Sequence, residues 1–479
     1  MPYNFLPADR EQLMLMPPSV AEWLPEEHLA WFVVDIVDEL DISAFLAAYR
    51  SDGRGGSAYH PAVMLALLVY GYAVGERSSR RIERRLVEDV AFRVVAANQR
   101  PDHATIARFR AAHQAAIAAL FGQVLAVCGR AGLLSADVVA VDGTKLPANA
   151  SRQANRTAQQ LAEQILREAA AVDAHEDRQE AQRFGDAEPA ERLLPARGRA
   201  RQQRLREILG ELETEAAQRS YEAHLERRAQ VRAQTGSPLR GRHPSPTAAT
   251  HRSRRQANLT DPDSRLLKTK HGYVQGYNAQ AVANEAQVVI AAEVVNDAND
   301  AASFAPMLTA AQSNLTTAGH HTPIGQALAD AGYWTTDNVN LPGIDVLIAP
   351  GRARNLARIG ATERDRDQIL TMVENGELDK DDAAARLNMT RTRVNQLLRK
   401  RRIGAPEPLA ATMMARLDTP KGKAAYKRRQ AIIEPVFGQI KHNRGIRHIT
   451  RRGLAAADSE WKLICATHNL LKVFRALPA

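Results

Sequence analysis

Two acidic residues each directly follow an aliphatic stretch of the sequence. Asp142 follows residues 138–141 in "VVAVDG", and Asp330 ends the stretch "IGQALAD". A glycine lies close behind each acid, at Gly143 and Gly332. Burying a carboxylate is costly unless a partner offsets its charge, and a metal ion is one such partner. The pattern predicts a cation site shared by the two acids, although each acid taken singly could equally be a helix N-cap or a turn residue.

A third acid, Glu434, stands among apolar residues in "YKRRQAIIEPVFGQIK". The apolar positions between 432 and 440 indicate one side of a helix, which Pro435 predicts to start or kink here. Glu434 could simply be ion-paired in so basic a segment. The functional interpretation is that it binds metal while its neighbours bind DNA phosphates. These neighbours are Tyr426, Arg429, Lys441, Arg444, Arg447, Arg451 and Arg452.

Three carboxylates without cysteine or histidine suit a hard cation, Mg²⁺ or Mn²⁺. Two such ions about 3.5–4 Å apart stabilise both the attacking and the leaving oxygen of a phosphoryl displacement. We therefore expect two metal ions and phosphodiester chemistry.

The overall charge favours a polyanionic partner. The formal net charge is +10 and the isoelectric point is about 9.7, which favours nucleic acid, although many arginines can also reflect a GC-rich genome. Cys128 and Cys465 lie far apart in the sequence, which argues against a disulfide framework and a zinc site. The first residues lack the pattern of a signal peptide, and the longest apolar run, 62–74, is too short to cross a bilayer. We expect a cytoplasmic protein that does not contact a membrane.

Residues 1–130 are predicted to form a helical domain. The stretch "AVMLALLVYGYAVG" is apolar nearly all round, which is typical of a central helix. Arg80 and Arg81 begin a cluster of arginines on the next helix, and "PDHATIARFR" suggests a further helix capped by Thr105. The clustered arginines favour a DNA-binding module. The alternative is a bundle with a solvated basic face.

The middle of the chain has the pattern of a mixed α/β sheet. Strands are expected at about 138–142, 273–282, 287–295, 325–330 and 344–349, with helices between them. In open α/β sheets, sites form at the carboxyl ends of strands. The acids after the first and fourth strands are therefore expected to meet there.

Two helical segments interrupt this sheet pattern. Residues 155–258 read as a long helical hairpin followed by a basic loop. Residues 351–420 contain a helix-turn-helix pattern. Its two helices would cross at Ala384 and Ala385, and its small core would hold Leu387, Met389 and Val394. Arg391 and Arg393 would then face outward toward DNA. The alternatives are a small helical insertion without a DNA role and a protein interaction surface.

The ordered set of motifs resembles the DDE transposases of bacterial insertion sequences. The matching stretches include "YHPAVMLALLVYGYAVGERSSRRIERRLVEDVAFR", "AVDGTKLPANAS", "DPDSRLLKTKHGYVQGYNAQ", "ALADAGYW" and "YKRRQAIIEPVFGQIK". The resemblance implies an RNase H-like catalytic domain with Asp142, Asp330 and Glu434 as its metal-binding triad. It also implies DNA contacts by Tyr426, Arg429 and Lys441, although four residues separate Arg429 from Glu434 where three are usual.

The resemblance divides the chain into six segments. These are a helical N-terminal DNA-binding domain (1–130), the first part of the catalytic domain (131–154), the hairpin insertion and basic loop (155–258), the continued catalytic domain (259–350), the helix-turn-helix-like insertion (351–420) and the C-terminal catalytic helices (421–479). The implied partners are double-stranded DNA, at the element ends and at the target, and a second copy of the chain. Tyr333 or Trp334 could stack on an unpaired base, unless it simply packs after its strand.

Two other functions stay open at this point. A hydrolytic nuclease on the same fold would cut DNA but not join it. A non-catalytic DNA-binding remnant of a transposase could act as a repressor, although three retained acids argue against decay.

Overall fold

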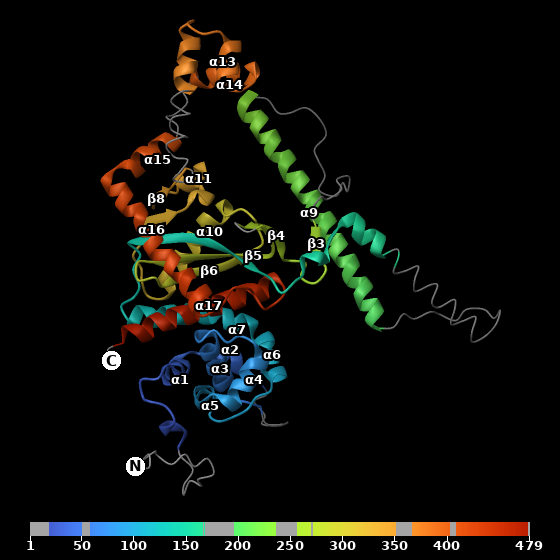
Figure 1. Cartoon of the computed structure of the whole chain (residues 1–479), viewed down its shortest axis with the longest axis vertical. Helices are drawn as coiled ribbons and strands as arrows, with labels where there is room; N and C mark the ends of the chain where they lie inside the picture. The colour runs from blue at the N-terminus through green and yellow to red at the C-terminus, as the bar shows by residue number, and fades with distance from the viewer. Residues whose placement is uncertain are drawn as a thin grey trace, which may run out of the picture.

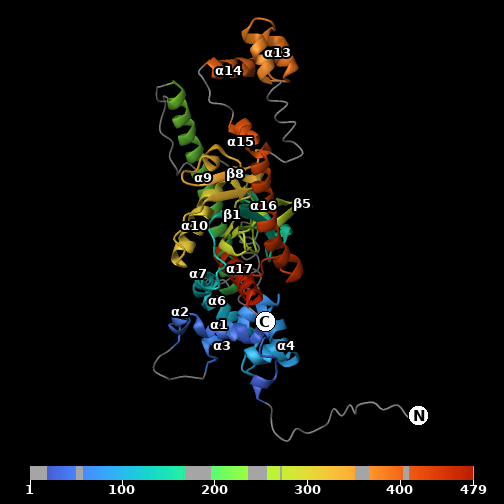
Figure 2. The same cartoon turned by 90° about the vertical axis from the view of Figure 1, so that its left-hand side faces the viewer.

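The computed structural model describes residues 19–49, 58–165, 167, 196–235, 256–269, 272–350, 366–402 and 409–477. A mixed sheet occupies the middle of the molecule, with the N-terminal helices at one end and the small unit of α13 (Lys380–Arg386) and α14 (Arg391–Arg402) at the other (Figure 1). The view turned by 90° shows the same order along the long axis (Figure 2).

The described residues between 19 and 130 contain helices and no strand, as the sequence predicts. The central apolar helix is α3, which is buried almost all round and packs against α1, α5 and the C-terminal α17. One predicted cap is wrong. Asp102, and not Thr105, caps α6, because the extended Asp102 precedes the helix and accepts the Thr105 amide at 2.6 Å. The helices are η1 (Val20–Glu22), α1 (Leu29–Glu39), α2 (Ser43–Leu46), α3 (Pro61–Ala73), α4 (Ser79–Glu88), α5 (Val90–Val95), α6 (His103–Ala112) and α7 (Gln114–Arg130).

All five predicted strands are present in one sheet. They are β1 (Val138–Pro147), β5 (Gly272–Asn284), β6 (Val289–Val295), β7 (Gln326–Ala329) and β8 (Asp345–Ile348). A sixth strand, β4 (Arg265–Thr269), pairs with the first half of β5. The order is β4-β5-β1-β7-β8, with β6 also paired to β5. Strands β1, β7 and β8 are parallel, and β5 is antiparallel to both β1 and β6. The fold is therefore α/β with a mixed sheet.

β1 does not end at Asp142, contrary to the prediction. It continues to Pro147 because β5 pairs with it along its whole length, from Val139↔Asn284 to Pro147↔Gly276. The parallel pairing with β7 does stop at Val141↔Ala329. Asp142 thus stands where the pairing with the parallel strand β7 ends and only the antiparallel pairing with β5 continues.

The predicted helical hairpin is described only in part. Residues 158–165 are helical, and α9 (Ala196–Thr235) is a single helix of 40 residues. A small separate core joins Leu161 to Leu205, Ile208 and Leu212 of α9. The base of this insertion is a short ladder between β2 (Asn155–Thr157) and β3 (Gln256–Asn258). The basic loop before β3 lies outside the described residues.

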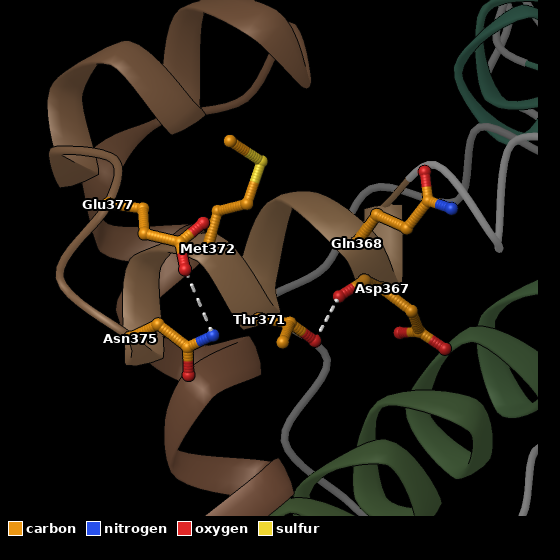
Figure 3. A pocket seen from close by; sticks show the side chains of 6 residues that line it. All are labelled: Asp367, Gln368, Thr371, Met372, Asn375 and Glu377. Carbon is orange, nitrogen blue, oxygen red and sulfur yellow. Dashed lines mark hydrogen bonds between the residues drawn. The ribbon is translucent and has the colours of Figure 1, made fainter.

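A second separate core holds the helix-turn-helix-like unit together. It comprises a helix at 366–374, α13 (Lys380–Arg386) and α14 (Arg391–Arg402). Val394 is buried and Asn388 forms the turn with a φ of 50°, as predicted. Met389 and Ala385 are exposed, so their predicted packing roles are wrong, and Ala383 with Leu370 fills the core instead. Figure 3 shows a polar hollow on this unit, lined by Asp367, Gln368, Thr371, Met372, Asn375 and Glu377.

The remaining helices cover the sheet and connect it to the N-terminal helices. They include α10 (Phe304–Thr317), α11 (Thr336–Val339), α15 (Leu409–Asp418), α16 (Pro420–Gly438) and α17 (Leu454–Ala476). One hydrophobic core runs from α1 through the sheet to α17. In the described part of the chain no single helix is long and apolar enough to cross a membrane, and α6 with α7, which meet at 74°, pass that test only as a pair.

Candidate active site

Asp142 and Asp330 lie at neighbouring positions on one edge of the sheet. Because Val141 and Ala329 are the last paired residues of the parallel strands β1 and β7, the acids that follow them are brought together. Each carboxylate also accepts a local amide. Asp142 Oδ1 accepts the Gly143 amide at 2.8 Å, and Asp330 Oδ1 accepts the Gly332 amide at 2.8 Å. Asp330 is thus the N-cap of the short helix η4 (Ala331–Tyr333). The N-cap alternative is therefore correct for Asp330, which also lies beside Asp142.

The electrostatics at Asp142 indicate uncompensated negative charge. Burial and the neighbouring Asp330 raise its pKa from 3.8 to about 6, although Arg429 opposes the shift. The Asp142 side chain is 23% exposed. A carboxylate held in this way favours a cation beside it.

Glu434 lies on α16, which packs against β1, β5 and β7. The helix begins at Pro420 and continues through Pro435, so it does not start at Pro435, the first of the two predicted alternatives. A proline lacks the amide that would bond the carbonyl four residues earlier, and Gln287 Nε2 donates to that carbonyl, of Ala431, at 2.9 Å. The Glu434 side chain is 56% exposed. It therefore faces outward from the helix rather than into the core.

Arg429 stands between two of the three acids. Its guanidinium lies 3.6 Å from Asp142 Oδ2 and 3.8 Å from Glu434 Oε1. The side chain is 12% exposed and stacks on the ring of Tyr426, with 5.8 Å between the guanidinium carbon and the ring centroid. The guanidinium therefore partly neutralises two acids that would otherwise repel each other.

Lys441 approaches the same edge from the other end of α16. It lies in the π-helical turn Gln439–Asn443, a widened turn that is frequent at functional sites. Its Nζ donates a short hydrogen bond to Thr144 Oγ1 on β1. Burial lowers the Lys441 pKa, and the charge of Asp142 opposes this shift. The structure thus places Tyr426, Arg429 and Lys441 around the acids.

Arg444 is not available to DNA, contrary to the prediction. It is buried, and its guanidinium donates to Thr467 Oγ1 and the Ile464 carbonyl at 2.8 Å each. The side chain turns inward because α17 offers these acceptors beneath the π-helical turn. Arg451 is half-buried and donates to Gln114 Oε1 at 3.1 Å, and burial lowers its pKa.

The other predicted DNA-binding arginines are exposed and lie far from the acids. Arg80 and Arg81 are on α4 at one end of the molecule, and Arg391 and Arg393 are on α14 at the other (Figure 1). Arg81 pairs with Glu76 at 3.1 Å and Arg391 with Asp381 at 2.6 Å. The structure therefore does not bring these four arginines to the carboxylates.

The sequence reasoning missed a buried polar network behind Asp330. Tyr333 is fully buried and its hydroxyl donates to Gln280 Oε1, so Tyr333 packs and cannot stack on a base. Gln280 and Asn278 of β5 both donate to Asp300, an acid in the loop after β6. The available signal was "VVNDAND", where acids again follow an aliphatic strand.

The acids fit a hard cation in type and in position, but they do not form a finished site as they stand. Among the described residues, no three His, Cys, Asp or Glu side chains lie close enough to hold a metal ion. Oxygen ligands at the carboxyl ends of strands are nevertheless the donors that Mg²⁺ and Mn²⁺ prefer. With Arg429 withdrawn, Asp142 and Glu434 would face the same space.

The geometry defines an α/β protein with carboxylates and cationic side chains gathered at one sheet edge. Two family comparisons place it further. Residues 18–112 match the Transposase domain (DUF772), and residues 371–474 match the Transposase DDE domain. These matches confirm the resemblance and support a DDE transposase of an insertion element, a family that generally uses divalent metal ions.

The matched regions cover the site unevenly. The second includes Tyr426, Arg429, Glu434 and Lys441, and neither includes Asp142 or Asp330. Searches of curated proteins and of solved structures found no match. The roles of the individual acids therefore stay predictions.

Proposed function

We propose that this protein is a DNA transposase that binds the ends of its element and catalyses metal-dependent phosphodiester hydrolysis and strand transfer. The observation that carries the proposal is that Asp142 and Asp330 directly follow the last paired residues of β1 and β7, with Glu434 and Arg429 of α16 beside Asp142. Two neighbouring acids, one of which keeps a raised pKa although Arg429 lies 3.6 Å away, are expected at a cation site.

We further infer that the catalytic domain is RNase H-like. The support is the sheet itself, in which the antiparallel β5 and β6 lie on one side of β1 and the parallel β7 and β8 on the other. A long helical insertion between β1 and β5 leaves this arrangement intact, because β2 and β3 close its base.

Asp142, Asp330 and Glu434 would hold the cations, Mg²⁺ or Mn²⁺. When bound, such ions activate water and neutralise charge on the phosphate. Arg429 must leave the space between Asp142 and Glu434 before these acids can share an ion. A DNA phosphate offers Arg429 a competing partner, since guanidinium groups bind phosphates strongly.

The chain's own residues then act on the DNA. Lys441, held against Thr144, is placed to contact a phosphate beside Asp142. In the first step water attacks the phosphodiester at an element end, and the 3′-oxygen leaves as a 3′-hydroxyl. In the second step that hydroxyl attacks a phosphodiester of the target, whose own 3′-oxygen leaves. One bond forms for each bond broken, so no external energy source is needed.

The partners follow from this chemistry. The substrate is double-stranded DNA, and we place the protein in the bacterial cytoplasm at the nucleoid. Because two element ends must be cut and joined together, we expect at least a homodimer on DNA. The exposed arginines of α4 and α14 are candidate contacts to the duplex away from the cleavage site.

The test is a cleavage and strand-transfer assay with purified protein, Mg²⁺ or Mn²⁺, and DNA carrying the element's own ends. Asp142→Asn is compared with Asp137→Asn, which makes the same change at the exposed residue just before β1. Wild type and Asp137→Asn should give metal-dependent nicks and joined products. Asp142→Asn should bind DNA and do neither.

Two outcomes would support the other functions. Nicks without joined products would indicate a hydrolytic nuclease. DNA binding without cleavage under any metal, in wild type as well as in both variants, would indicate a non-catalytic remnant.

A further inference from the structure

Asp300 lies at the same sheet edge as Asp142 and Asp330. It follows β6, which is antiparallel to β5, as β1 is. The strands β1, β6 and β7 therefore run in one direction, and Asp300 contacts Asn278 and Gln280, the β5 residues that pair with Lys145 and Gly143 of β1. The negative charge of Asp300 also contributes to the raised pKa of Asp142.

Two hydrogen bonds fix one carboxylate oxygen of Asp300, and this orientation determines where the second oxygen lies. Asp300 Oδ1 accepts from Asn278 Nδ2 at 2.6 Å and from Gln280 Nε2 at 3.0 Å. No hydrogen bond to Oδ2 occurs among the residues that the structure describes. An ionised carboxylate can accept about four hydrogen bonds, so this second oxygen keeps its capacity for a ligand.

The free oxygen of Asp300 borders the same space as Asp330. A Cβ atom built on Gly332 would lie 2.9 Å from Asp330 Oδ1 and 3.4 Å from Asp300 Oδ2. A side chain at Gly332 would therefore fill the gap between the two acids. The glycine leaves this gap open.

A buried oxygen without a partner lies on the other side of Asp300. Asn278 is fully buried, yet its Oδ1 has no hydrogen-bond partner. This oxygen lies 3.1 Å from a Cβ position built on Gly143, the residue after Asp142. Leaving such an oxygen unpaired costs about 1–3 kcal/mol, which is unexpected unless a ligand or its water shell approaches. The amide of Asn278 thus reaches from Asp300 toward the Asp142 end of the site.

We propose that Asp300 is a fourth carboxylate of the cation site. Asn278 and Gln280 hold its Oδ1, so that its Oδ2 would be available to a cation that Asp330 also holds. The inference rests on the proposed function, because it assigns a further ligand to the same metal site.

The first experiment measures Mn²⁺ binding to the full-length protein by electron paramagnetic resonance, without DNA. Asp300→Asn keeps the shape and the acceptor oxygen that Asn278 and Gln280 bind, so it should fold. We expect it to weaken Mn²⁺ binding at least tenfold, as Asp142→Asn should. The matched control is Asp297→Asn, in the same loop with an exposed side chain, and it should bind as wild type does.

The second experiment separates a ligand from a residue that only positions Asp330. Asp300→Cys should gain Cd²⁺ binding relative to Asp300→Asn while Mg²⁺ binding stays lost, because a thiolate prefers soft metals. Asp142→Cys is the comparison. The native Cys128 and Cys465 are buried and burial raises both thiol pKa values, so their background should be small.

The outcomes keep the two proposals apart. Wild-type Mn²⁺ affinity in Asp300→Asn, with loss in Asp142→Asn, would overturn the role of Asp300 and leave the proposed function standing. Loss in Asp300→Asn without a gain of Cd²⁺ in Asp300→Cys, while Asp142→Cys gains it, would overturn direct ligation. No Mn²⁺ binding by wild type would overturn the metal site of the proposed function itself, and Asp300 with it.

Discussion

At the scale of single residues, the negative charges of the carboxylates are incompletely neutralised in the ligand-free protein. Asp142 keeps a pKa of about 6 with Arg429 only 3.6 Å away, because burial and Asp330 outweigh that one contact. Arg429 is itself shared with Glu434. The residues are thus arranged for a ligand that supplies positive charge, at the expense of stability without it.

Asp142→Asn should stabilise the metal-free protein at neutral pH. A folded pKa raised from 3.8 to about 6 means that the folded state holds the proton more tightly, so the free energy of unfolding falls as pH rises from about 4 to about 6. The loss is roughly 2–3 kcal/mol, at about 1.4 kcal/mol per pKa unit. Urea unfolding at pH 7.5 should therefore show a more stable variant, and the two proteins should converge near pH 4. Asp137→Asn is the control. A variant no more stable than wild type at pH 7.5 would contradict the charge argument.

Loss of the charge at Arg444 should mainly lower the stability of the protein, whereas loss of the charge at Lys441 should mainly lower DNA cleavage. Arg444→Gln removes two buried hydrogen bonds that a charged group makes to α17, and it should lower the free energy of unfolding by about 1–3 kcal/mol. Lys441→Gln should change stability by less than about 1 kcal/mol and should reduce DNA cleavage. Urea unfolding and the cleavage assay, run on both variants, test this pair. If Arg444→Gln were as stable as wild type and weakened DNA binding, its assignment as a buried structural residue would be wrong.

At the scale of elements, the segment "DPDSR" joins the sheet to the C-terminal helix. Asp263 Oδ2 accepts the Leu454 amide at 2.8 Å, and Asp261 Oδ1 accepts the Gly453 amide at 3.1 Å. Both amides lie at the start of α17, where the N-cap residue, Gly453, makes no side-chain hydrogen bond that would cap the helix. Tyr277 of β5 fixes Asp261 through a 2.7 Å hydrogen bond. A helix that covers the sheet is thus capped from a segment about 190 residues earlier.

Asp263→Ala should remove this cap and cost about 1 kcal/mol, within a range of about 0.5–2 kcal/mol. Asp263→Asn keeps an acceptor oxygen and should cost less. Chemical unfolding of the two variants measures both values. Equal losses in the two variants would mean that the charge of Asp263, rather than its hydrogen bond, stabilises α17.

At the scale of the whole molecule, the N-terminal helices and the catalytic end share one core. Arg77, which follows α3, reaches Glu460 of α17 at 2.8 Å and the His448 carbonyl at 2.7 Å. Gly75 lies directly against the backbone of Arg444, and a Cβ atom there would stand 2.2 Å from the Arg444 carbonyl oxygen. The helices at 366–402 differ, because they have a core of their own.

Gly75→Ala should therefore be much more destabilising than Gly132→Ala. Both glycines have a positive φ, of 84° and 71°, so both variants bear a conformational cost of about 1 kcal/mol. Only at Gly75 does the new methyl group collide with backbone, whereas nothing lies within 4 Å of the Gly132 position. Thermal unfolding should show a loss of more than about 3 kcal/mol for Gly75→Ala. Similar losses for the two variants would contradict the close packing of Gly75 against the backbone of Arg444.

The local structure and much of the site can be predicted from the amino-acid sequence. Strand periodicity predicts all five main strands, and only the end of β1 is missed by more than two residues. The strongly apolar α3 is predicted as a central helix. Both patterns reflect burial that neighbouring residues encode. The acids at 142 and 330 are predicted to meet because parallel strands end at a common edge.

The tertiary structure decided what depends on contacts between distant segments. It carried β1 past Asp142 through its pairing with β5, turned Arg444 inward onto α17, set Arg429 between two acids and brought Asp300 beside Asp330. Spacing along the chain does not encode these outcomes, because each depends on which partner, dozens to hundreds of residues away, fills the space beside a side chain.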